Sequence, residues 1–183
     1  MKKTIGYVLS HTHWDREWYL SFQLFRMRLV DMLDTLFPYL EQHPEFPHFH
    51  LDGQTVCLED YLEVRPDQAE RLRHLIEAGR IAVGPWYVLP DLQCIGQESI
   101  LRNLSRGLAL AQRFGGGTPV GYLPDIFSHP AQLPQIFAGY DFRAAVIWRG
   151  SSDDPEPPYE VLWRAPDGTQ LLTLRLPDDR GYL

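Results

Sequence analysis

The stretch TIGYVLSHTHWDREWYLSFQLFRMRLVDMLDTLFPY, residues 4–39, decides the fold class. It opens with a short, nearly unbroken apolar run over residues 4–9, which is typical of a strand that is covered on both faces. A longer segment, residues 22–39, follows, and its apolar residues recur at helical spacing: Leu24, Phe25, Leu29, Met32, Leu33 and Leu36. The chain therefore begins with a predicted strand and an amphipathic helix.

The same alternation continues along the chain. Apolar runs predict further strands at residues 46–51, 80–87, 120–123 and 144–148, and apolar periodicity predicts helices at 67–78, 97–114 and 134–138. An exposed loop is predicted at 151–158, and a hairpin around the Pro-Asp-Gly of residues 166–168. Strands that alternate with helices indicate βαβ units and a parallel sheet, either open or closed into a barrel.

Composition limits the classes of function. The 183 residues, of which 44% are hydrophobic and 22% charged, fit one soluble globular domain. The net charge of −7 would repel a phosphate backbone, so nucleic acid is not an expected partner. No apolar run approaches the roughly 20 residues of a membrane span, and no secretory signal is recognised, so we expect a cytoplasmic protein. Cys57 and Cys94 are interpreted as two buried thiols.

The first predicted strand leads into HTHWDREW, residues 11–18. If the backbone stays extended, the side chains of His11, His13 and Asp15 point to one side, because strand side chains alternate. An imidazole and a carboxylate so placed are ligands for zinc or a similar divalent ion, although an isolated pair of this kind can also be a simple hydrogen bond. Trp18 could form an aromatic wall of a small-molecule site or part of the core.

A second group of polar residues lies in GYLPDIFSHP, residues 121–130. Asp125 follows a short apolar strand and is expected at the same end of the sheet as His13 and Asp15. Active sites in parallel α/β folds gather beyond the carboxyl ends of the strands, so the three side chains could converge. The alternative is that Asp125 is a helix cap or a turn residue.

Taken together, HTHWDREW and GYLPDIF resemble glycoside hydrolase family 38, the metal-dependent retaining α-mannosidases, and particularly its microbial members, which are similar to mannosylglycerate hydrolases. The resemblance covers residues 1–183 as the N-terminal part of the catalytic domain. It implies an α/β fold with a seven-stranded parallel β/α barrel of the glycoside hydrolase and deacetylase type, incomplete in this chain.

The resemblance also implies roles for individual residues. Asp125 would be the catalytic nucleophile that forms a covalent glycosyl-aspartate intermediate with an α-mannoside. Zn²⁺, or another divalent cation, would be bound by His13, Asp15 and Asp125. Arg149 would lie beside the nucleophile and hold it ionised.

Substrate contacts are implied less strongly. Trp18 and Phe127 would line the sugar site, and Asp91 would either touch substrate or remain a surface carboxylate. Three further histidines are expected in supporting or structural roles: His11, His48 and His50.

One departure from the family pattern concerns the rest of the catalytic machinery. In the family, the acid/base aspartate and a further histidine ligand come later than position 183, so we expect a fragment that is inactive alone. Two alternatives stay open. One is a metal-dependent polysaccharide deacetylase, although the sequence shows no HxxxH ligand pair, and the other is a non-catalytic carbohydrate-binding domain. The identity of the α-mannoside and the formation of a homo-oligomer are also left open.

Overall fold

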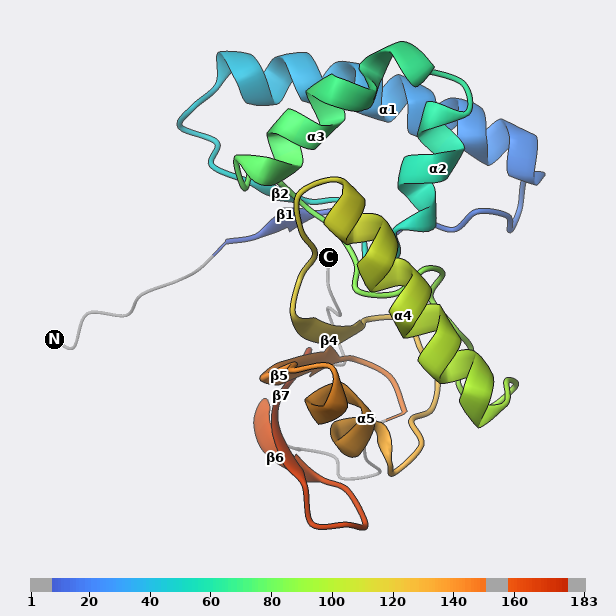
Figure 1. The fold of residues 1–183 in the computed structure, drawn as a ribbon, viewed down its shortest axis with the longest axis vertical. Coiled ribbons are helices and arrows are strands. Elements are labelled where there is room, and N and C mark those ends of the chain that lie inside the picture. The colour runs from blue at the N-terminus through green and yellow to red at the C-terminus, as the bar shows by residue number, and fades with distance from the viewer. Residues whose placement is uncertain (1–7, 151–157, 178–183) are drawn as a thin grey trace, which may run out of the picture.

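The computed structural model describes residues 8–150 and 158–177. In Figure 1 the first three helices lie together above a small sheet, and a second sheet lies at the opposite end of the molecule. The small sheet is parallel and contains β1 (Ser10–His11), β2 (Phe49–His50) and β3 (Ile81–Ala82) in that order. Helix α4 (Gln97–Arg113) runs from the first part of the molecule toward the second.

The helices over the first sheet enclose one hydrophobic core. They are α1 (Phe22–Gln42), α2 (Val56–Leu62), the 3-10 helix η1 (Pro66–Gln68) and α3 (Ala69–Glu77). Four residues of α1, three or four positions apart, are completely buried, which explains why this segment is an amphipathic helix: Leu29, Leu33, Phe37 and Leu40. They pack in one cluster with Leu51, Tyr61, Leu72 and Ile81.

The second sheet joins β4 (Val120–Leu123), β5 (Ala144–Ile147), β7 (Gln170–Arg175) and β6 (Glu160–Arg164) in that order. The β4–β5 and β5–β7 pairs are parallel, whereas β6 and β7 form an antiparallel hairpin. Helix α5 (Leu133–Gly139) covers this sheet (Figure 1). A second hydrophobic cluster fills the space between these elements, with Trp86, Leu104, Leu123, Phe137 and Ile147 among its members.

Helix α4 connects the two halves through a close backbone contact. A Cβ atom built on Gly107 would lie 2.2 Å from the carbonyl oxygen of Pro85, so only glycine fits where α4 crosses this segment. The indole of Trp86, in the same segment, donates a hydrogen bond of 3.0 Å to the carbonyl of Tyr122 in β4. The packing of α4 therefore helps to fix β4, the strand that leads to Asp125.

The predicted seven-stranded parallel barrel is wrong. The described strands form two separate sheets, one of three parallel strands and one of four mixed strands, and residues 8–150 and 158–177 contain no closed barrel. Closure requires continuous pairing around the whole sheet. Here the first sheet pairs over only two residues per strand, and the hairpin of β6 and β7 ends the second sheet with an antiparallel strand.

Most of the predicted helices and the hairpin are confirmed, with small shifts at their ends. Helix α2 was not predicted. The expected first strand, residues 4–9, and the expected loop, 151–158, lie mostly outside the described residues. Cys57 is buried as expected, but Cys94 is exposed, so the interpretation of two buried thiols is wrong for Cys94.

Within the described residues, no helix is both long enough and apolar enough to cross a membrane. The cytoplasmic location stays a prediction.

Candidate active site

His13, Asp15 and Asp125 converge on one another. The Nε2 atom of His13 lies 3.5 Å from Oδ1 of Asp15 and 3.6 Å from Oδ2 of Asp125. Asp125 follows β4, and the other two residues follow β1, so the side chains meet beyond the ends of strands from different sheets. Strand β1 ends at His11, so a loop, and not the alternation of an extended strand, brings His13 and Asp15 to this point.

Arg149 binds the other oxygen of the Asp125 carboxylate. Its Nε atom lies 2.7 Å from Oδ1 of Asp125. The guanidinium carbon lies 4.9 Å from the centre of the Phe127 ring and 4.2 Å from that of Trp148, so two aromatic faces hold it. The carbonyl of Arg149 also lies 2.9 Å from Nε2 of His129. The predicted position of Arg149 beside Asp125 is therefore observed.

A buried carboxylate lies on the far side of the His13 ring. Asp52 has no exposed surface, and its Oδ1 atom lies 3.8 Å from Nδ1 of His13. Burial lowers the pKa of His13, but the carboxylates of Asp52, Asp15 and Asp125 outweigh burial, and the net direction is upward. The sequence analysis assigned no role to Asp52.

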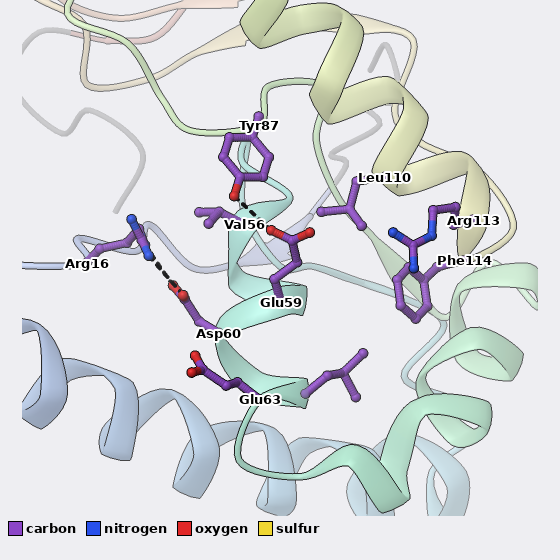
Figure 2. A pocket seen from close by; sticks show the side chains of 10 residues that line it. Arg16, Val56, Glu59, Asp60, Glu63, Tyr87, Leu110, Arg113 and Phe114 are labelled. Atoms are coloured by element: carbon purple, nitrogen blue, oxygen red, sulfur yellow. Dashed lines mark hydrogen bonds and ion pairs between the residues drawn. The ribbon is translucent and has the colours of Figure 1, made fainter.

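Beyond Asp15, the HTHWDREW segment is held to α2 (Figure 2). Arg16 makes a bidentate ion pair with Asp60: its Nε atom lies 2.7 Å from Oδ2, and its Nη2 atom lies 2.9 Å from Oδ1. These residues line a cavity of about 450 Å³. In the same cavity the hydroxyl of Tyr87 donates a hydrogen bond of 2.7 Å to Glu59.

Three residues predicted to contact substrate make no described contact with His13 or Asp125. Phe127 is 61% exposed and reaches the site through the Arg149 guanidinium. Trp18 is exposed, and its ring meets Tyr19 edge-on at 5.2 Å. Asp91 is exposed in a loop after β3 and accepts a hydrogen bond from Cys94 at 3.5 Å. The structure thus places Phe127 against Arg149, the ion-pair partner of Asp125, and gives Trp18 and Asp91 no described contact with His13 or Asp125.

His13, Asp15 and Asp125 offer donor types that a divalent metal ion binds. One imidazole nitrogen and two carboxylate oxygens are ligands that zinc accepts, and two ligands of a tetrahedral zinc ion lie about 3.3 Å apart. The two measured separations from His13, 3.5 and 3.6 Å, are close to that value. Among the residues that the structure describes, no group of three or more His, Cys, Asp and Glu side chains could hold an ion as arranged.

Comparison with known proteins identifies the family. Residues 3–182 match the model of the glycosyl hydrolases family 38 N-terminal domain. A protein of Halalkalibacterium halodurans named "Putative mannosylglycerate hydrolase" is 40% identical over 96% of this chain and 21% of its own length. Human "Alpha-mannosidase 2C1" is 26% identical over 94% of this chain and 17% of its own length.

The crystal structure of an α-mannosidase from Enterococcus faecalis V583 has the same fold over this region. It superposes with a TM-score of 0.85 at 38% identity, over 91% of this chain and 19% of that protein. The chain spans only 16 to 21% of the length of the curated relatives that it matches. On this evidence, the chain belongs to glycosyl hydrolase family 38, whose N-terminal domain it matches over nearly all of its residues.

Proposed function

We propose that this chain provides the nucleophile and most of the metal ligands of a retaining, metal-dependent α-mannosidase. The observation that supports this proposal best is the placement of Asp125. One of its carboxylate oxygens faces His13 Nε2 at 3.6 Å, and the other lies 2.7 Å from Arg149. A carboxylate between a metal ligand and a fixed cation is suited to attack an electron-poor carbon. The family match favours a glycoside hydrolase over the polysaccharide deacetylase that the sequence left open.

In the proposed reaction, Asp125 attacks the anomeric carbon and forms a glycosyl-aspartate ester as the leaving group departs. Arg149 holds the carboxylate in place from one side, and its stacking on Phe127 limits its movement. His13, Asp15 and Asp125 would hold a zinc ion, and that ion would supply a Lewis acid that orients the sugar hydroxyls. A second carboxyl group, about 5 Å from the nucleophile, is required as acid and base.

We propose that this acid/base group and a further histidine ligand lie in a part of the enzyme outside these 183 residues. The substrate class is an α-mannoside, and the relative named as a mannosylglycerate hydrolase favours a small mannoside of that type. The chain alone would then not turn over a mannoside whose leaving group needs protonation.

An activated sugar tests this proposal without the missing acid. Fluoride departs without protonation, so a fluoro-substituted α-mannosyl fluoride should react with the zinc-loaded chain. Mass spectrometry should show one added sugar per chain, mapped to the peptide that contains Asp125. An Asp125→Asn variant should remain unlabelled, whereas Asp31→Asn, which changes an exposed carboxylate on α1, should be labelled normally. Labelling that persists in Asp125→Asn, or no labelling of the wild type, would contradict the proposal.

A further inference from the structure

Asp125 and Arg149 occupy corresponding positions beyond two neighbouring strands. Strands β4 and β5 are parallel, and Leu123 is paired with Ile147. Asp125 lies two residues after Leu123, and Arg149 lies two residues after Ile147, so the register of the sheet brings the two backbones side by side. The register does not fix the long side chain of Arg149, which is 40% exposed and has many rotamers.

Three alternate residues of the segment after β4 contact Arg149. Asp125 pairs with its Nε atom, and the ring centre of Phe127 lies 4.9 Å from its guanidinium carbon. The Nε2 atom of His129 lies 2.9 Å from its carbonyl oxygen. The next residue, Gly150, has a φ of +65°, and a Cβ atom there would lie 2.0 Å from the carbonyl oxygen of Phe127. Residues 125–129 therefore hold Arg149 at both its side chain and its backbone.

The hydrogen bond between His129 and Arg149 has only one possible direction. A carbonyl oxygen accepts and cannot donate, so Nε2 of His129 carries the proton. The ring is half-buried, and an edge-on contact with Trp163 of β6, 5.6 Å between ring centres, limits its rotation. Burial lowers the pKa of His129, although the bond to the carbonyl opposes this. The ring is thus neutral at neutral pH and adds no positive charge beside the guanidinium.

We propose that His129 is a positioning residue for the nucleophile and acts through Arg149. By binding the carbonyl of Arg149, it fixes the backbone from which the guanidinium reaches Asp125. No described contact joins His129 to Asp125 itself. This inference rests on the proposed function, because it takes Asp125 as the nucleophile.

The first test measures how fast the zinc-loaded chain is labelled by the mannosyl fluoride. His129→Leu removes the donor and should slow labelling about threefold to tenfold, the factor that corresponds to one lost hydrogen bond. His129→Gln keeps an amide that can donate to the same carbonyl and should recover most of the rate. His48→Leu removes an exposed imidazole and should be labelled like the wild type.

A double-mutant cycle separates action through Arg149 from a general loss of packing. If His129 acts through the guanidinium, His129→Leu should slow the wild type but should not slow a chain that already carries Arg149→Met. A general loss of packing would slow both chains by the same factor. Urea unfolding of each variant establishes that it is folded in the assay.

NMR of the arginine side chains gives a second readout that needs no sugar. The guanidinium of Arg149 lies near the rings of Phe127 and Trp148, so their ring currents displace its Nε–H signal. Arg149→Met assigns this signal by its loss. His129→Leu should move the signal toward the position of exposed arginines, and His129→Gln should leave it in place.

Several results would overturn the inference. One is an unchanged labelling rate and an unchanged Arg149 signal in His129→Leu. Another is a slowing that persists in the Arg149→Met chain or that His129→Gln does not relieve. If His129→Leu does not fold, long-range nitrogen–proton NMR of the wild type still tests the hydrogen bond, since a His129 ring with its proton on Nδ1 would exclude it. If the wild type is not labelled, the proposed function fails, and the Arg149 signal alone decides whether His129 holds the guanidinium.

Discussion

His50 makes the stability of this fold sensitive to mild acid. It is the last residue of β2, only 4% exposed, and its ring meets that of Tyr122 edge-on at 4.7 Å. Burial lowers the pKa of His50 to about 4, although the carboxylate of Asp52 raises it and His11 lowers it further. The native protein therefore keeps this imidazole neutral under conditions in which an unfolded chain protonates it.

The sign and size of the effect follow from the two pKa values. Because an unfolded histidine titrates at 6.5 and the native one at about 4, the unfolded chain binds the extra proton between these values. Stability is thus lost as the pH falls from 6.5 toward 4. Between pH 7 and pH 5 the loss from this one group amounts to about 2 kcal/mol in the free energy of unfolding.

His50→Phe isolates this contribution, since phenylalanine keeps a ring against Tyr122 and cannot titrate. Urea unfolding, followed by tryptophan fluorescence at pH 7 and pH 5, should show a pH-dependent loss about 2 kcal/mol smaller in the variant than in the wild type. His48→Gln, which removes an exposed imidazole, should behave like the wild type. The reasoning is refuted if His50→Phe and the wild type lose the same stability over this range.

Three further perturbations test the packing and the site. In urea unfolding, Gly107→Ala should lower the free energy of unfolding by about 3 kcal/mol or more, because the added Cβ meets the backbone of residues 85–87. Gly139→Ala is the control: it has open space around it and should be neutral or stabilising. Arg80→Ala should lower the free energy of unfolding by about 1–3 kcal/mol in the same assay, because the Arg80 guanidinium donates to four carbonyls at the end of α1 and in the loop that follows. An unchanged urea midpoint would contradict this. Arg149→Met should slow labelling of Asp125 by the mannosyl fluoride about tenfold, because it removes the cation that holds the nucleophile ionised and in place. An unchanged labelling rate would show that this ion pair does not contribute to the reaction.

Local signals in the sequence explain which elements could be predicted. The apolar stripe between residues 97 and 114 and the three glycines that follow specify α4 and its end, and Gly115 and Gly116 do adopt positive φ angles. Strand β4 matches its predicted bounds because an apolar run stands between turn residues. Helix α2 was missed because seven residues are too few to show helical periodicity.

The barrel was implied by the family resemblance, because the pattern of strands and helices had left both an open sheet and a barrel possible. Alternating strands and helices predict parallel pairing between neighbours, but they do not determine whether the first and last strands meet. The pairing of β4 with β5 and of β5 with β7, and the separation of these strands from β1 to β3, depend on contacts distant in the sequence.

For the candidate site, the sequence predicted the residues that carry a motif. His13, Asp15, Asp125 and Arg149 lie together as expected, but their chemical roles stay predictions. Asp52 was missed because its importance depends on a hydrogen bond to Trp14, 38 positions away, and a carboxylate after a strand has no local signal of burial. Such contacts become visible only in three dimensions.

The most direct measurement is a crystal structure of the chain with zinc, with anomalous scattering recorded at the zinc edge. We expect one anomalous peak bound by His13 Nε2 and by carboxylate oxygens of Asp15 and Asp125, at about 2.0–2.2 Å from each. A peak bound by other residues, or a zinc-saturated crystal in which these three side chains face apart, would contradict the account.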